Sequence, residues 1–110
     1  MKEVKRQWGR FMQFVLNKKC TVKIIEVKAG EELSLQRHKK RVEEWYFLTS
    51  GEIQLGTKKK RISKGELIKI KKGQSHRLIA GKKPVQILEI SLGNFSEKDE
   101  ERLEDKYGRR

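Results

Sequence analysis

The sequence predicts a small all-β domain, a sandwich or a barrel, with a short helical turn near its C-terminus. Apolar residues come in short runs, several of which alternate with polar residues as in half-buried strands. Glycines separate these runs at short intervals and supply the backbone freedom that tight turns need. The chain has 110 residues, so we expect a single domain over residues 1–110.

Eight strands are predicted from these runs, which are rich in β-branched and aromatic residues. In chain order they are Phe11–Leu16, Thr21–Val27, Glu32–Gln36, Trp45–Ser50, Glu52–Leu55, Glu66–Ile70, Ser75–Ile79 and Val85–Leu92. The single proline, Pro84, precedes the last strand, where a missing N–H does least harm. Helix signals appear only after these strands: Ser96 is a candidate cap for a turn through Asp99, and charged residues continue to Arg102.

The net charge of +13 suggests an anionic partner, either nucleic acid or an anionic metabolite. The basic clusters fall where turns are predicted, at Lys18–Lys19, Lys39–Arg41, Lys58–Arg61, Lys71–Lys72 and Lys82–Lys83. Charges scattered over turns indicate solvation and protection of strand edges more than one binding stripe, so nucleic acid is disfavoured as a partner. The abundance of Lys and Glu, with few Asn, Cys and Met, is also typical of heat-adapted proteins.

No apolar stretch approaches the roughly 20 residues of a membrane span. The best candidate for a secretory apolar region, at residues 11–16, is short and contains Gln13. The single cysteine, Cys20, forbids an internal disulfide and cannot build a thiolate metal site alone. We therefore expect a soluble, cytoplasmic protein with no membrane partner.

Both histidines of the chain, His38 and His76, lie at predicted strand edges beside other candidate ligands. Gln36 is two residues before His38, so the two side chains share a face of an extended segment. Glu43 and Glu44 lie where the next strand begins. Two imidazoles, a carboxylate and an amide oxygen suit a divalent zinc, manganese, iron, cobalt or nickel ion. Residue types alone leave open the alternative of two unrelated surface histidines.

The spacing of these residues resembles the two motifs of the cupin family. The first motif is Gly-x5-His-x-His, a short gap, then Glu-x6-Gly, and this chain matches it with Gly30, Gln36, His38, Glu44 and Gly51. The second motif is Gly-x5-Pro-x-Gly-x2-His-x3-Asn, and the matching positions are Gly65, Lys71, Gly73, His76 and Ala80. Both histidines thus fall on ligand positions, whereas the motif proline and asparagine are replaced.

Several stretches resemble one subfamily, the C-terminal cupin domain of type II phosphomannose isomerases, which is often fused to a mannose-1-phosphate guanylyltransferase. They are residues 5–9, 34–38, 41–45, 73–78, 81–84, 87–90 and 104–109. The resemblance implies a jelly-roll barrel, also called a double-stranded β-helix, and a divalent metal, zinc first, held by Gln36, His38, Glu44 and His76. The gap between His38 and Glu44 is one residue longer than in the family, so Glu43 is a rival ligand.

The resemblance also implies an enzyme, a metal-dependent mannose-6-phosphate isomerase that interconverts mannose 6-phosphate and fructose 6-phosphate. The metal would stabilise the enediolate, and Glu43 or Glu89 is the candidate catalytic base. Glu89 is notable because it lies within an apolar strand. The candidate substrate-binding residues are Arg41, Tyr46, Lys82 and Lys83.

We expect a homodimer because exposed aromatic patches usually mark interfaces. The candidate contacts are Trp8, Phe11, Phe14 and the opposite face of Trp45. Three alternatives remain at this level. The first is a cupin that binds a sugar or sugar nucleotide without turnover. The second is another metal-dependent cupin enzyme, such as a dioxygenase, since one fold hosts many chemistries. The third is a nucleic-acid binder.

Overall fold

The computed structural model describes residues 1–94, 96 and 98–104, and these residues form strands and no helix. No helix among them could therefore span a lipid bilayer. The strands are β1 (Lys2–Arg6), β2 (Gly9–Gln13), β3 (Cys20–Val27), β4 (Leu35–Arg37), β5 (Val42–Phe47), β6 (Gly51–Leu55), β7 (Lys58–Ile62), β8 (Leu67–Ile70), β9 (His76–Ile79), β10 (Val85–Leu92) and β11 (Glu101–Glu104).

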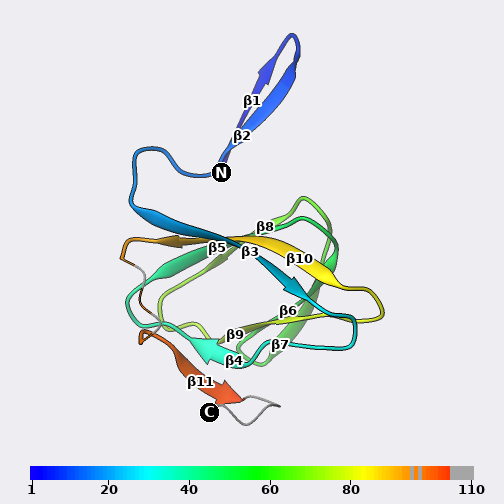
Figure 1. Cartoon of the computed structure of the whole chain (residues 1–110), viewed down its shortest axis with the longest axis vertical. Helices are drawn as coiled ribbons and strands as arrows, with labels where there is room; N and C mark the ends of the chain where they lie inside the picture. Colours follow the sequence, from blue (N-terminus) through cyan, green and yellow to red (C-terminus); the bar gives the residue numbers. More distant parts are fainter. Residues whose placement is uncertain (95, 97, 105–110) are drawn as a thin grey trace.

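Two antiparallel sheets face each other and form a barrel (Figure 1). One sheet has the order β3-β10-β5-β8, and the other has the order β11-β4-β9-β6-β7. The longest pairing joins β3 to β10, from Val27 opposite Val85 to Cys20 opposite Leu92. Because neighbours in the sheets are often distant in the chain, residues from β4, β5, β9 and β10 meet inside the barrel. The all-β barrel predicted from the sequence is confirmed.

The core lies between the two sheets, where alternate side chains of each strand point inward. Trp45 and Phe47 of β5 are buried there with Ile53, Leu78 and Ile87 of three other strands. Fully burying a side chain of this kind stabilises the fold by about 1.5–3 kcal/mol. The parity of β5 therefore places Trp45 and Phe47 inside the barrel, and with them Glu43.

Gly51, at the start of β6, is required by a close approach inside the barrel. A Cβ atom at this position would lie 2.7 and 2.9 Å from the two γ-methyl carbons of Val85 and 3.3 Å from a ring carbon of Phe47. Real side chains essentially do not pack this closely. Glycine is therefore required at this motif position because a side chain would clash with Val85 and Phe47, and not because the backbone has a positive φ angle.

The first strands differ from the prediction of a single strand over Phe11–Leu16. Strands β1 and β2 pair only with each other among the described residues and form a hairpin that projects from the barrel (Figure 1). Its base touches the barrel where the ring of Phe14 lies 5.1 Å from that of Tyr46. Half of the ten residues before Phe11 are charged, so the first strand has no apolar alternation to reveal it.

The expectation that Lys58–Arg61 forms a turn is wrong, because these residues belong to β7. The four side chains are exposed on the edge strand of the larger sheet. Lysines on an edge strand hinder pairing with another chain, and they leave no apolar pattern in the sequence.

The helical turn expected from Ser96 through Asp99 is present only as a hydrogen-bonded turn, and the charged residues up to Arg102 do not continue it as a helix. The Asp99 N–H donates to the Ser96 carbonyl at 3.1 Å, and the chain then enters β11 at Glu101. Arg102 lies opposite Gln36 of β4, so strand pairing overrides the local helix signal.

Candidate metal centre

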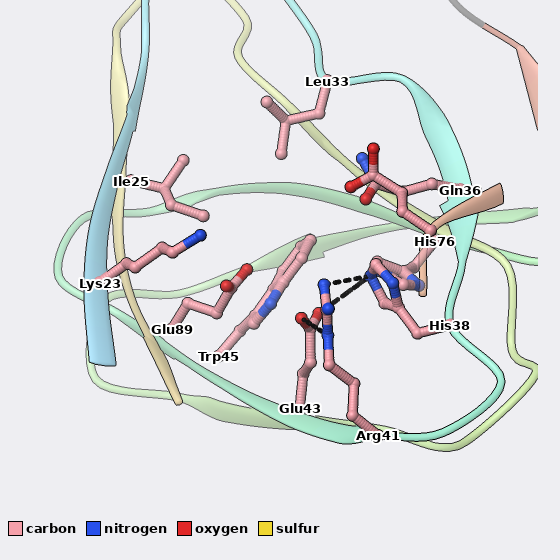
Figure 2. A pocket seen from close by; sticks show the side chains of 11 residues that line it. Lys23, Ile25, Leu33, Gln36, His38, Arg41, Glu43, Trp45, His76 and Glu89 are labelled. Atoms are coloured by element: carbon pink, nitrogen blue, oxygen red, sulfur yellow. Dashed lines mark hydrogen bonds and ion pairs between the residues drawn. The ribbon is translucent and has the colours of Figure 1, made fainter. Parts of the chain in front are cut away.

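Two histidines and one glutamate meet inside the barrel, each carried by a different segment. His38 follows β4, Glu43 lies near the start of β5, and His76 begins β9 (Figure 2). All three are buried, and one ligand atom from each lies within 4.8 Å of the others. Glu43 Oε1 is 3.6 Å from His38 Nε2 and 3.5 Å from His76 Nε2.

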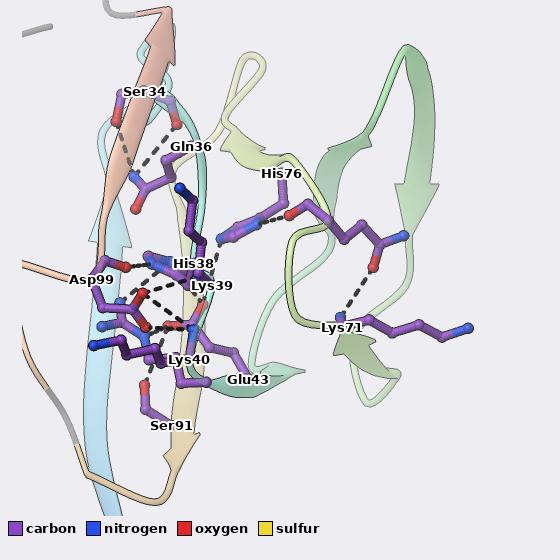
Figure 3. A network of polar contacts seen from close by, with 12 residues as sticks. Ser34, Gln36, His38, Lys39, Lys40, Glu43, Lys71, His76, Ser91 and Asp99 are labelled. Atoms are coloured by element: carbon purple, nitrogen blue, oxygen red, sulfur yellow. Dashed lines mark hydrogen bonds and ion pairs between the residues drawn. The ribbon is translucent and has the colours of Figure 1, made fainter.

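Backbone carbonyls fix which nitrogen of each imidazole faces the cluster. His38 Nδ1 donates to the Asp99 carbonyl at 2.8 Å, and His76 Nδ1 donates to the Gln74 carbonyl at 2.9 Å (Figure 3). Burial lowers the pKa of His38, against the opposing effect of Glu43, so its ring is neutral near pH 7. Nε2 is therefore the nitrogen of each ring that faces the glutamate, as in metal sites whose histidines are oriented by backbone acceptors.

The Glu43 carboxylate completes the cluster, and one of its two oxygens lacks a hydrogen-bond donor in the part of the chain that the structure describes. Burial raises the pKa of Glu43, but His76, His38 and Arg41 outweigh burial and bring it to about 2, so the group is ionised. Its buried Oε1 has no hydrogen-bond partner among the described residues. Ligands about 2.1 Å from a tetrahedral ion lie about 3.4 Å apart, close to the two observed distances. The donor set therefore fits a divalent transition metal ion.

Gln36, the fourth ligand predicted from the sequence, lies near the two histidines. It lies directly opposite His76 across the pairing of β4 and β9 and lines the same cavity. Its amide nitrogen donates to Ser34 Oγ at 2.9 Å, which leaves the amide oxygen as the group able to bind a cation.

Arg41 lies inside this cluster and not on an exposed rim. Its guanidinium is buried and donates through Nε to Glu43 Oε2 at 3.0 Å and through Nη1 to the Ser96 carbonyl at 3.0 Å. Nη2 lies 3.3 Å from His38 Nε2, which is the acceptor because Nδ1 carries the ring proton. In this structure Arg41 is thus bonded to two of the candidate metal ligands.

Glu89 lies beside this cluster on the inner face of β10, opposite Trp45 on one side and Lys23 on the other. Burial raises the pKa of Glu89 to about 7, an effect that Glu43 strengthens and Lys23 opposes. All four residues line a cavity of about 160 Å³ together with the histidines (Figure 2). A carboxyl group with a pKa near neutrality can both accept and donate a proton.

Glu44 and Tyr46, expected as a metal ligand and a substrate contact, are not brought to the cavity. They share a face of β5, as predicted, but it is the outer face. Glu44 Oε1 lies 4.0 Å from Lys69 Nζ, and the Tyr46 hydroxyl donates to the sulfur of Met12 at 3.6 Å. The structure thus places Glu43 with the histidines in the position expected for Glu44, and Glu43 cannot serve at once as ligand and as the separate base.

Lys82 and Lys83, expected to bind substrate phosphate, lie at the opposite end of the barrel. They precede Val85, whereas Glu43 pairs with Ser91 six residues further along β10. At about 3.3 Å per residue, this separates the two positions by about 20 Å. These lysines line a different hollow with Arg61.

Three residues of the site were missed by the sequence analysis. Lys23 shares the inner face of β3 with Ile25, so strand parity could have identified it as an inward-facing cation. The Ser91 hydroxyl donates to Glu43 Oε2 at 3.2 Å, and the Asp99 carboxylate accepts from the backbone N–H groups after His38 (Figure 3). No local signal marks Asp99, because its partners lie some sixty positions earlier in the chain.

Comparisons with known proteins show which family and which fold this chain resembles. The family model described as "Mannose-6-phosphate isomerase C-terminal" matches residues 1–105. "Mannose-1-phosphate guanylyltransferase ManC" of Salmonella typhimurium is 35% identical over 98% of this chain and 23% of that protein. "Alginate biosynthesis protein AlgA" of Pseudomonas aeruginosa is 39% identical over 97% of this chain and 23% of that protein. The chain thus spans less than a quarter of the length of these curated relatives.

A solved structure shows the same fold at low sequence identity. It is a cupin 2 conserved barrel domain protein from Rhodopseudomonas palustris, which aligns with a TM-score of 0.65. The alignment covers 82% of this chain and 67% of that protein at 18% identity. This likeness supports the barrel architecture.

Proposed function

Because this chain belongs to the family of mannose-6-phosphate isomerase C-terminal domains, we propose that it is a metal-dependent mannose-6-phosphate isomerase. The proposed reaction converts mannose 6-phosphate and fructose 6-phosphate into each other. The observation that supports it most strongly is the buried Glu43 Oε1, which faces Nε2 of both histidines and has no hydrogen-bond partner among the described residues. Such a group of acceptors calls for a cation.

The proposed ligands are His38, Glu43, His76 and the amide oxygen of Gln36. Zinc is the first candidate, and manganese, iron, cobalt and nickel accept the same mixture of nitrogen and oxygen ligands. When bound, a divalent ion would supply a Lewis acid that polarises the substrate carbonyl and stabilises an enediolate.

Glu89 is the proposed catalytic base. The reaction moves one proton between C2 and C1 of the sugar. One group must therefore accept the proton from one of these carbons and donate it to the other. Glu89 lies diagonally across the β5–β10 pairing from Glu43, a relation in which the two residues are about 7–8 Å apart. This distance leaves room for the reacting carbons between the ligand cluster and the base.

The cavity indicates which part of the substrate is enclosed. Its volume of about 160 Å³ lies below the roughly 300–1,000 Å³ of pockets that enclose whole ligands, so only the reacting end of a hexose fits. Lys23 and Arg41 are cations that line it, and the net charge of +13 raises the local concentration of anionic sugars. We propose that Lys23 and Arg41 bind the anionic substrate, the role that the sequence analysis assigned to Lys82 and Lys83.

The proposal is tested by metal content and turnover in a matched pair of variants. The protein is stripped with a chelator, reloaded with one metal at a time and assayed with a coupled isomerase assay. Glu43→Gln should lose bound metal and turnover, whereas Glu44→Gln, altered on the other face of the same strand, should keep both. Equal behaviour of the two variants would refute the ligand assignment.

The assay also separates catalysis from binding. Metal binding and uptake of mannose 6-phosphate with no isomerisation under any metal would show a sugar-phosphate-binding cupin without turnover. In that case Glu89→Gln should leave calorimetric binding of the sugar phosphate intact.

A further inference from the structure

The lone pair of His38 that points into the cluster is already engaged. Arg41 Nη2 lies 3.3 Å from His38 Nε2, and the opposite ring nitrogen donates its proton to the Asp99 carbonyl at 2.8 Å. A guanidinium has only donors, and Nδ1 holds the ring proton against the Asp99 carbonyl, so Nε2 is the acceptor. A single lone pair of a neutral imidazole can bind either an N–H group or a metal ion, and not both.

The guanidinium also supplies the positive charge that the cluster otherwise lacks. Arg41 is buried, and its Nε donates to Glu43 Oε2 at 3.0 Å, while Glu43 Oε1 faces the two histidines. A divalent ion bound by these ligands would lie close to a fixed cation. Repulsion between them is strong in a buried site because solvent screens it little.

We propose that Arg41 is a built-in competitor of the metal: in the metal-free protein its guanidinium occupies the cation's place at His38, and metal binding displaces it. This inference rests on the metal site of the proposed function and adds a regulatory step to it. Displacement breaks the Nη2–His38 contact, whereas the Nε–Glu43 contact is on the other carboxylate oxygen and can persist.

The displaced guanidinium changes its role in the cavity. In this structure its Nε, Nη1 and Nη2 are directed at Glu43, the Ser96 carbonyl and His38. Release from His38 makes Nη2 available as a charge-assisted donor to an anion in the same cavity. Metal loading would then prepare the site for an anionic substrate, so that metal binds first and substrate second.

The opposite role for Arg41 makes the opposite prediction. Some residues do not touch the metal and only orient one of its ligands by a hydrogen bond. Removing such a residue lowers metal affinity by about 10–100-fold. A competitor strengthens metal binding when it is removed. The sign of the change in affinity therefore decides between the two roles.

The experiment measures zinc binding by isothermal titration calorimetry to the full chain, as wild type, Arg41→Gln and Arg77→Gln. Glutamine removes the charge of Arg41 but keeps an amide able to donate to Glu43. Arg77 is the matched control, because it is also buried and paired with carboxylates, to Glu32 at 2.9 Å and Glu104 at 3.3 Å, on the outer face of β9. We expect Arg41→Gln to bind zinc about tenfold more tightly or better, and Arg77→Gln to match the wild type.

A second measurement uses the unaltered protein and does not depend on how the variants fold. Titration of ¹⁵N-arginine-labelled protein with zinc should shift the side-chain signals of Arg41 and leave those of Arg77 in place. Unchanged or weaker zinc binding by Arg41→Gln, or Arg41 signals that do not move while zinc binds, would overturn the competition and leave the metal site standing. If neither the wild type nor Arg41→Gln binds zinc, both the metal site and the competition are overturned.

Discussion

Replacing Glu89 with glutamine tests two properties of the buried carboxyl group in the cavity. One is its role in catalysis, and the other is its unfavourable contribution to the free energy of unfolding. The side chain is 7% exposed and lies on the inner face of β10 between Trp45 and Lys23. Burial, with the nearby charge of Glu43, raises the pKa of Glu89 from 4.5 to about 7 in the folded protein. The neutral amide of glutamine has a similar shape and no proton to lose.

The sign and size of the effect follow from proton linkage. Between about pH 4.5 and 7 the folded protein holds a proton on Glu89 that the unfolded chain has released, so the free energy of unfolding falls as pH rises. The difference between about 7 and 4.5, at 1.36 kcal/mol for each pH unit, gives a loss of about 3 kcal/mol above pH 7. Glu89→Gln escapes this loss.

The expected result is therefore a gain in stability that depends on pH. Urea unfolding of the chelated proteins should show equal stability below about pH 4.5 and a gain of about 3 kcal/mol for Glu89→Gln near pH 8. The same variant should lose isomerase turnover, because the base has been removed. Glu26→Gln, altered at an exposed position on the outer face of β3, controls for the loss of one negative charge. A gain that is equal at every pH, or that Glu26→Gln reproduces, would refute the reasoning.

Three further predictions concern other parts of the molecule. Gly51→Ala should lower the free energy of unfolding by about 1–3 kcal/mol in thermal or urea unfolding, because its methyl group would overlap a valine of β10. The chain should form a homodimer in light scattering at micromolar concentration, and Trp8→Ser should weaken it, since Trp8 on the projecting hairpin is 74% exposed. Lys23→Ala should weaken calorimetric binding of mannose 6-phosphate severalfold, whereas the double change Lys82→Ala and Lys83→Ala should not, because only Lys23 lines the cavity of the histidines.

The barrel and both histidines could be predicted from the sequence because each has a local signal. Strand β6 alternates polar and apolar residues from Glu52 to Leu55, other strands alternate over part of their length, and glycines mark the turns between them. The spacing of Gln36, His38 and His76 relative to the turn glycines carries the family motif. The structure brings these three side chains to one cavity, as expected.

The choice between Glu43 and Glu44 could not be made from local spacing. A shift of one residue moves every side chain of a strand to the other face, and two neighbouring glutamates fit the motif in either register. One signal in the sequence does favour Glu43: it shares its parity with Trp45 and Phe47, and the largest apolar side chains of a strand belong in the core. The contribution of Lys82 and Lys83 could not be judged either, because sequence does not show at which end of the barrel a turn lies.

The inner faces of the strands explain why the cluster lies where it does. Along β5 the inward side chains run from Phe47 through Trp45 to Glu43, and along β10 they run from Ile87 through Glu89 to Ser91. The two strands run antiparallel, and in this register Phe47 lies opposite Ile87 while Glu43 lies opposite Ser91. The apolar residues of both strands therefore lie toward one end of the barrel and the polar residues toward the other. The apolar end supplies the packing that holds the barrel together. The polar end holds charged groups that are buried away from water. Burial makes these charges costly to stability and strengthens their interactions with a cation or an anion. Buried charges at that end are therefore better explained by chemistry than by stability, and this is why the metal, the base and Arg41 are all assigned to it.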